Sequence, residues 1–335
     1  MDLSFSVEQE QLRDTVTSLL DKHSPPERVR AAEPLGFDPE LWDRLAELGV
    51  PSIGFAEAAG GLGGGLLDLG VIAAAAGRFL ASAPVVESCV ATRAVAALTG
   101  DAGGLLGGPV LTFCPRPVTA GATAPLVRYG AVADTVVAKN GDRLVLVGQQ
   151  PSGTAPASLG CAALGHVDFD GPGVSQLAAG DEASARFEVA RDEWFALSAA
   201  ALAGLAAAAL DLGVDYVKAR HQFGVPIGSF QSVAHRLADV AAEVDGAALL
   251  WQKALWSLDE GEPRAAELAR MAFANAAAVA ERASLTSLHF HGGYGFMLEY
   301  DIQLYARRAK AWGLAGGGPN HALDLVADAM YGPRS

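Results

Sequence analysis

Hydrophobic positions recur at two different spacings along the chain, and the change of spacing divides it into three parts. In the first and last parts, apolar residues fall three and four positions apart, which is typical of amphipathic helices. Between them, from about 106 to 190, short apolar runs alternate with Gly, Pro, Ser and Asp. That alternation is typical of short strands joined by turns. The pattern therefore predicts helices on either side of a small β unit.

The first third predicts a set of helices. Ser6 and Gln9 form the pattern of a capping box, which begins a helix running to about His23. A second helix is expected to start at 38–40 and to end at Gly49, and further helices are expected over 66–81 and 85–98. The glycine-rich segment 60–65 has no strand before it and no Gly-Lys-Ser/Thr after it. We therefore interpret it as a flexible loop and not as a phosphate-binding loop.

The spacing of hydrophobic residues also predicts the elements in the middle and at the end of the chain. Short strands are predicted at 110–113, 133–138, 143–147, 166–169 and 185–189, which suggests a small barrel or sandwich. Helices are predicted at 192–219, 229–258, 262–290, 300–312 and about 320–330, and short turns between long helices indicate an antiparallel bundle. We expect an α+β multidomain fold with an N-terminal helical domain (1–105), a central β domain (106–190) and a C-terminal four-helix bundle (191–335).

Composition narrows the class of protein. The chain has 335 residues, 51% of them hydrophobic and 19% charged, which indicates a globular protein. Its net charge of −14 argues against a nucleic-acid or anionic-membrane partner. Cys89, Cys114 and Cys161 show no CxxC pairing, which fits a reducing cytoplasm without disulfides or a metal site. We see no signal peptide, and the uncharged run 194–210 is short for a membrane span, so a buried bundle helix is expected there.

One sharp turn in the last third carries candidate chemistry. Gly224, Pro226 and Gly228 interrupt a strongly helical pattern directly after Arg220, Gln222 and Phe223. A guanidinium, an amide and an aromatic ring on one turn suit a ligand with an anionic part and a flat part. The alternative is a plain helix hairpin, in which Arg220 pairs on the surface and Phe223 is core.

Two stretches resemble signatures of the acyl-CoA dehydrogenase family. The first is Arg-x-Gln-Phe-Gly-x-Pro-Ile-x-x-Phe-Gln at 220–231, and the second begins His-Gly-Gly-Tyr-Gly-Phe at 291–296 and continues to 310. They come in the family's order, and the resemblance extends weakly over the N-terminal third. It implies an FAD cofactor, an acyl-CoA substrate and α,β-dehydrogenation, in which a carboxylate takes the α proton and the flavin takes the β hydride.

The resemblance carries over to the cofactor residues one by one. Arg220, Gln222 and Phe223 match the turn that reaches the ADP part of a neighbouring subunit's cofactor, and Gln231 closes that motif. Two further matches lie in the second signature: Gly292 and Gly293 correspond to glycines whose backbone approaches the pyrophosphate, since a missing Cβ allows close contact. His289 stands where the family usually has a glutamine. The alternative for the two glycines is a simple turn after a helix.

The catalytic base does not carry over directly. Where the family's common pattern has its glutamate, an ungapped match gives Gly316. A second family group places the glutamate at the start of the helix that leads to the 220 turn, and there the match gives Trp194. A one-residue slip would make Glu193 the base, while the plainer interpretation is that Asp192 and Glu193 are first-turn acids favoured by the helix dipole.

The middle domain departs as well. The family's Thr-Glu-Pro and Gly-Ser-Asp segment is expected near Leu111, where this chain matches only Thr112, and no tryptophan lies between Trp42 and Trp194. We therefore expect a flavin-dependent dehydrogenase subunit that completes the FAD site of an oligomer. Alternatives are a non-catalytic partner of a Glu-bearing relative, a divergent homo-oligomer using Glu193, and oxidation by oxygen. The acyl group and the electron acceptor are not readable from the sequence.

Overall fold

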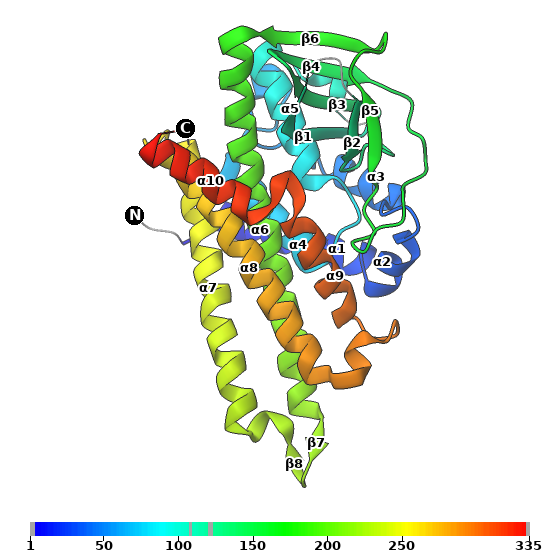
Figure 1. Cartoon of the computed structure of the whole chain (residues 1–335), viewed down its shortest axis with the longest axis vertical. Helices are drawn as coiled ribbons and strands as arrows, with labels where there is room; N and C mark the ends of the chain where they lie inside the picture. Colours follow the sequence, from blue (N-terminus) through cyan, green and yellow to red (C-terminus); the bar gives the residue numbers. More distant parts are fainter. Residues whose placement is uncertain (1–3, 107–108, 120–122, 333–335) are drawn as a thin grey trace.

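The computed structural model describes residues 4–106, 109–119 and 123–332, and it confirms the predicted fold class: helices on either side of a small β unit (Figure 1). The capping box is formed as expected, because the Ser6 hydroxyl accepts from the Gln9 backbone N–H at 3.2 Å and the Gln9 side chain accepts from the Ser6 N–H at 3.1 Å. The N-terminal helices are α1 (Val7–His23), α2 (Pro26–Ala32), α3 (Pro39–Glu47), α4 (Leu66–Arg78) and α5 (Val85–Thr99).

Helix α2 was not predicted. Helix α1 ends at His23 as expected, and Pro26 occupies the first turn of the next helix. Proline suits that position because its fixed φ matches the helix and its missing N–H has no intrahelical acceptor there. A new helix therefore begins only three residues after α1 ends.

The described residues of the central unit form six strands, which are β1 (Leu111–Val118), β2 (Thr123–Val127), β3 (Thr135–Asn140), β4 (Arg143–Gly148), β5 (Gly165–Asp168) and β6 (Val174–Ala179). One sheet has the order β1-β3-β4-β6, with β1 parallel to β3 and the other pairs antiparallel. A second sheet pairs β2 with β5. The predicted strands at 133–138, 143–147 and 166–169 are confirmed with shifts of one or two residues at their ends, and the one at 110–113 is confirmed but extends to Val118. Strands β2 and β6 were not predicted.

The strand predicted at 185–189 is wrong, because these residues belong to α6 (Gly180–Ala219). Gly180, with φ of +61°, ends β6 and starts the helix. Ala183, Phe187 and Ala190 are buried at spacings of four and three, so the helical period outweighs the strand propensity of Phe and Val. The boundary expected between 190 and 191 consequently lies inside α6, and the division into domains stays an interpretation.

Helix α6 is the axis of the molecule and contacts both helical parts. Its alanines and glycines let neighbours approach closely: an added Cβ on Gly204 would lie 1.9 Å from the carbonyl oxygen of Ala74 on α4. In the described part of the chain, α6 alone is long and apolar enough to cross a membrane, but 67% of its apolar window is buried inside the protein. It is therefore a core helix, as the sequence predicts for its uncharged run.

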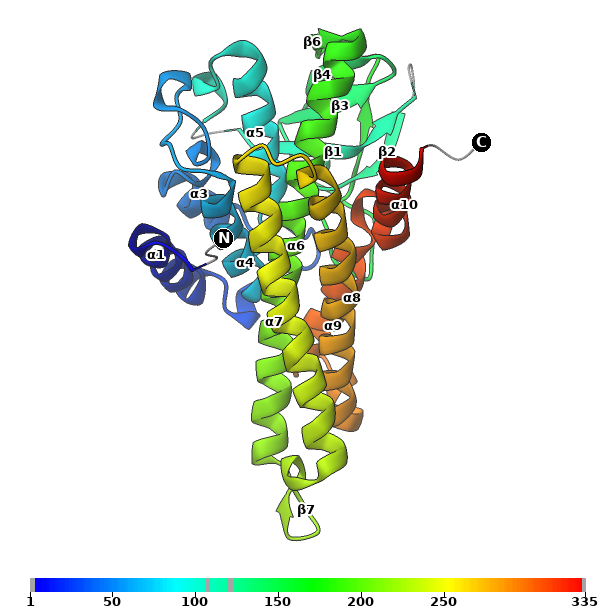
Figure 2. The ribbon, with the colours of Figure 1, turned by 90° about the vertical axis from the view of Figure 1, so that its left-hand side faces the viewer.

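The C-terminal part continues with α7 (Gln231–Asp259), α8 (Ala265–His291), α9 (Ile302–Gly313) and α10 (Gly318–Tyr331). Helices α7 and α8 run beside α6 (Figure 2). A two-stranded hairpin of β7 (His221–Gln222) and β8 (Val225–Pro226) joins α6 to α7. It lies at the end of the bundle opposite the central β unit (Figure 1).

Candidate functional site

The turn singled out in the sequence is an exposed hairpin. His221 pairs with Pro226 and Gln222 with Val225, and the two residues between them, Phe223 and Gly224, both have positive φ, at +53° and +82°. Such a turn suits a tight hairpin but is unusual for a phenylalanine. The Phe223 side chain is 93% exposed, so the alternative that placed it in the core is wrong. Among the described residues, no carboxylate forms an ion pair with Arg220.

The second signature lies beside the base of this hairpin. Tyr216, in the last turn of α6, stacks on His291 at the end of α8, with ring centroids 4.0 Å apart. The short helix η5 (Gly292–Phe296) follows directly. Gly292 has φ of +61°, and an added Cβ on Gly292 or Gly293 would meet no atom within 4 Å.

The cofactor residues predicted from the resemblance therefore gather at one end of the bundle. We call this surface the hairpin face, and it consists of Arg220, Gln222, Phe223, Gln231, His289, Gly292 and Gly293. All of these residues are exposed. The backbone at Gly292 and Gly293 is open, and the same face carries the Arg220 guanidinium, which has no ion-pair partner among the described residues. The exposed Phe223 ring contacts Phe230 edge to face. These groups together fit a ligand with phosphates and a flat ring.

A cavity of about 810 Å³ lies elsewhere, where β1 and β2 meet the segment 158–164, the end of α9 and the short helix η6 (Ala315–Gly317). We call it the central cavity. Its described lining includes the cationic side chains Arg116, Arg128 and Lys310 and contains no Asp or Glu. It was not recognised from the sequence because residues distant along the chain form it. The charge pattern of the lining suits an anionic ligand and offers no carboxylate for taking a proton.

The two positions where the resemblance expects a glutamate are in direct contact here. Gly316 lines the central cavity with φ of +64°, and an added Cβ would lie 2.5 Å from the indole ring of Trp194. Trp194 is fully buried, and its ring packs on Phe195 and Phe273. In the described part of the chain its indole N–H has no acceptor. An apolar ring thus fills the space beside the missing carboxylate.

Glu193 is placed away from the central cavity. Its carboxylate accepts two hydrogen bonds from the Arg93 guanidinium of α5, at 2.8 and 3.0 Å, and the side chain is only 9% exposed. Its neighbour Asp192 pairs with Arg270 of α8 at 2.7 Å, and burial raises the pKa of Asp192 to about 6. Both acids lie well inside α6, because the helix begins at Gly180, so they are not first-turn residues. Each holds α6 to another helix.

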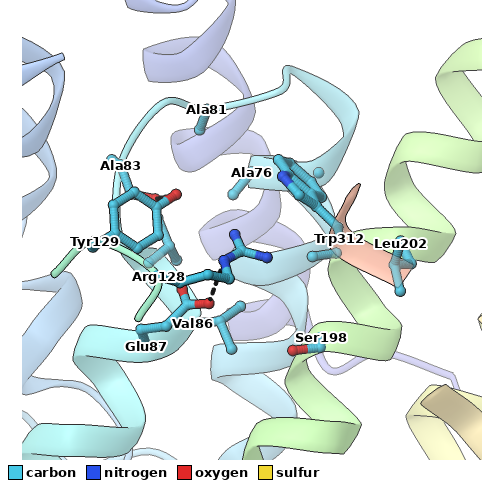
Figure 3. Close-up of a pocket in the computed structure, with 13 residues that line it drawn as sticks. Ala76, Ala81, Ala83, Val86, Glu87, Arg128, Tyr129, Ser198, Leu202 and Trp312 are labelled. Carbon is cyan, nitrogen blue, oxygen red and sulfur yellow. Dashed lines mark hydrogen bonds and ion pairs between the residues drawn. The ribbon is translucent and has the colours of Figure 1, made fainter. Parts of the chain in front are cut away.

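A second, smaller cavity adjoins the central one. It measures about 30 Å³, and Arg128 and Trp312 line both cavities. The Arg128 guanidinium lies between the rings of Tyr129 and Trp312, 5.5 and 5.7 Å from their centroids, and pairs with buried Glu87 at 3.1 Å (Figure 3). This arrangement could not be predicted from the sequence, because Arg128 directly follows β2, a strand that was not predicted.

The arrangement fits the two halves of a flavin dinucleotide unequally. The hairpin face offers open backbone, a guanidinium and a ring for the phosphate-bearing half. In the central cavity, Pro115 and Pro117 of β1 lack the N–H groups that could donate to a flavin ring, and the described lining contains no carboxylate. The chain's own cavity therefore does not fit the reacting half of the cofactor together with a base.

Comparisons with known proteins agree with the resemblance. The family model "Acyl-CoA dehydrogenase, N-terminal domain" matches residues 6–102, and "Acyl-CoA dehydrogenase, C-terminal domain" matches residues 187–331. The acyl-CoA dehydrogenase IpdE2 of Mycolicibacterium smegmatis is 34% identical over 331 residues, covering 95% of this chain and 97% of that protein.

Solved structures show the same architecture. The ChsE4–ChsE5 complex from Mycobacterium tuberculosis contains a chain that is 28% identical, with a TM-score of 0.87 and full coverage of both chains. A variant of the Tcur3481–Tcur3483 steroid ACAD gives a TM-score of 0.85 at 26% identity, covering 96% of this chain and 97% of that one.

Proposed function

Because the chain belongs to the acyl-CoA dehydrogenase family, we propose that it works as one subunit of an FAD-dependent acyl-CoA dehydrogenase oligomer. In this proposal its hairpin face completes the FAD site of a neighbouring subunit, and that neighbour carries the catalytic glutamate. The family consists of flavin-dependent oxidoreductases. What is proposed here is which subunit completes the FAD site and which supplies the catalytic glutamate.

The observation that carries the proposal is the contact between Trp194 and Gly316. At both positions where the family places its base, this chain has a residue that cannot take a proton, and the two fill each other's space. The described lining of the central cavity has no Asp or Glu. Desolvated carboxylates serve as bases in such sites because burial brings their pKa toward the working pH. A chain without one needs a partner that supplies it.

The hairpin face supports the other half of the proposal. Trp194 lies on α6 and Arg220 directly follows the last residue of that helix, so at 1.5 Å per residue they are about 39 Å apart along its axis. The hairpin face is therefore remote from the chain's own central cavity, and its exposed residues suit a cofactor held mainly by another subunit. When bound, FAD supplies the acceptor for the β hydride of the acyl thioester.

In this scheme the chain's own residues bind and orient the cofactor. Arg220 donates in a planar fork to phosphate oxygens, and Gln222 adds amide donors beside it. The ring of Phe223 covers a flat part of the cofactor, and Gly292 and Gly293 let the pyrophosphate approach the backbone. The α proton is taken by the neighbour's glutamate.

A homo-oligomer that uses Glu193 is the weaker alternative. The Glu193 carboxylate is held by Arg93 and is not among the residues that line the central cavity. For substrates, one of the structural relatives is a steroid ACAD. Ring-bearing acyl-CoA thioesters are accordingly the first to test alongside linear ones.

The test is to purify the chain alone and after co-expression with a Glu-bearing family member encoded beside it, and to measure bound flavin by visible absorption. We expect flavin only in the complex, and turnover only there. Arg220→Ala in this chain should lower the flavin content of the complex. Arg186→Ala, which removes an exposed arginine near the other end of α6, is the matched control and should leave it unchanged. Stoichiometric flavin and turnover in the chain alone would overturn the proposal.

A further inference from the structure

We infer that the central cavity is a binding site for an apolar carboxylic acid, which it holds without transforming it. This goes beyond the proposed function, because it concerns the chain's own cavity and not the cofactor site that the hairpin face completes. The inference stands on three independent features: the size and apolar wall of the cavity, its charge, and the exposed apolar side chains around its mouth.

The cavity has the size and wall of a small-molecule site. Its volume of about 810 Å³ falls within the range of roughly 300–1,000 Å³ that is usual for such sites. Most of the lining is apolar. It includes Val127, Leu164 and Trp312, together with prolines on β1 and β2. Such a wall favours an apolar chain or ring system over a sugar or a free phosphate.

The charge of the cavity selects an anion. Arg116 forms no ion pair with any described residue, whereas Arg128 is neutralised by Glu87 and Lys310 by Glu281. Arg116 is therefore the cation left to receive a ligand. No described Asp or Glu lines the cavity to repel an anionic group or to hold a cation.

The backbone beside the cavity adds to this preference. Gly316, Gly317 and Gly318 have φ of +64°, +106° and +80°, and α10 begins at Gly318. Gly316 and Gly317 line the cavity. Gly316 and Gly317 place no side chain in the cavity, and the N-terminus of α10 beside them favours negative charge. The anionic end of a ligand is thus expected between this turn and Arg116.

The mouth of the cavity carries unpartnered apolar side chains. Leu126, Leu159 and Leu314 all line the cavity and remain 52%, 66% and 58% exposed. Leu126 also has an unusual φ of +57°. Because three exposed leucines from three segments meet around one cavity, a ligand with an apolar body would cover them together.

The experiment uses the purified chain without flavin and the fluorescent probe 8-anilinonaphthalene-1-sulfonate, an apolar aromatic anion. We expect saturable binding that dodecanoate displaces and dodecanol displaces at least tenfold less well. Arg116→Gln should weaken dodecanoate binding about tenfold, since a charged hydrogen bond is lost. Arg143→Gln, on β4 outside the cavity, is the matched control and should bind as the unaltered chain does.

A filling variant separates the cavity from the exposed apolar surfaces elsewhere. Thr123 is exposed and lines the cavity, so Thr123→Trp should reduce its volume without entering the core, and dodecanoate displacement should be lost. Equal displacement by dodecanol and dodecanoate would overturn the inference, as would unchanged binding in both Arg116→Gln and Thr123→Trp. Flavin content of the co-expressed complex is a separate measurement, so failure here is distinguishable from failure of the proposed function.

Discussion

The indole ring of Trp194 lies 2.5 Å from the point that a Cβ on Gly316 would occupy. The two residues are far apart in the sequence, and each stands where an ungapped match to one group of the family expects the catalytic glutamate. Their contact shows that the two expected base positions are neighbours in space. In this chain an apolar indole ring occupies the space between them, so we expect that a single substitution does not restore a base there.

The first prediction concerns Gly316. Gly316→Ala should destabilise the chain by about 2–4 kcal/mol, because the new Cβ meets the Trp194 ring and the residue has a positive φ. Gly261→Ala is the matched control: Gly261 has φ of +66°, but nothing lies within 4 Å of its added Cβ. That substitution should lower the free energy of unfolding by only about 1 kcal/mol, because the positive φ is its only unfavourable feature. The free energy of unfolding from denaturant titration gives both values. If both variants lose the same free energy of unfolding, the close approach of position 316 to the Trp194 ring is contradicted.

A second prediction follows for activity. Gly316→Glu alone should yield no dehydrogenase turnover in the purified chain, since the side chain cannot enter the space that the indole holds. Turnover of acyl-CoA with an artificial electron acceptor is the measurement, with the thermal midpoint recorded to confirm folding. Turnover appearing in this single variant would show that the cavity supports the chemistry after all.

The third prediction concerns the pair of Arg93 and Glu193. Glu193→Ala should lower the free energy of unfolding by about 3–5 kcal/mol, because it leaves a largely buried guanidinium without a partner. Glu267→Ala removes one member of the pair with Arg264, which is 66% exposed, and should cost about 1 kcal/mol or less.

The conservative variant Glu193→Gln separates structure from catalysis. It keeps the shape of the side chain, so turnover of the co-expressed complex should stay within a few-fold of the unaltered complex. A loss of a thousandfold or more in kcat, with folding intact, would make Glu193 the base and revive the homo-oligomer alternative.

The sequence predicted the architecture well where local signals agree with the fold. Ser6 with Gln9, and the three-and-four spacing along α7 and α8, are local features that tertiary contacts reinforce. The wrong predictions have local causes too: 185–189 carries strand-forming residues on a helical period, and Pro26 begins a helix where none was predicted. The Arg93–Glu193 pair could not be predicted because it depends on how α6 lies against α5, and the central cavity could not because β1, β2, the segment 158–164 and the end of α9 form it together.

The fourth prediction concerns Phe223, which is 93% exposed. Phe223→Ala should leave the stability of the isolated chain within about 0.5 kcal/mol, since the ring makes few intramolecular contacts. In the co-expressed complex it should lower flavin retention during gel filtration. Val189→Ala, at an exposed position near the other end of α6, should change neither quantity. Equal flavin retention in both variants would show that Phe223 does not help to bind the cofactor.

The fifth prediction is a pH dependence at the junction of α6 and α8. His291 is buried against Tyr216, and burial lowers the pKa of His291 below 6.5. The unfolded chain therefore binds a proton more readily than the folded one, so stability is retained above pH 6.5 and falls as the pH drops through the lower, folded-state pKa. Because Gly292 follows directly, acidification should also loosen the hairpin face. His291→Phe keeps a ring in the stack and should flatten the dependence of unfolding free energy on pH below 6.5. His235→Asn, at an exposed position of α7, should preserve it. A slope that survives in His291→Phe would assign the acid sensitivity to another group.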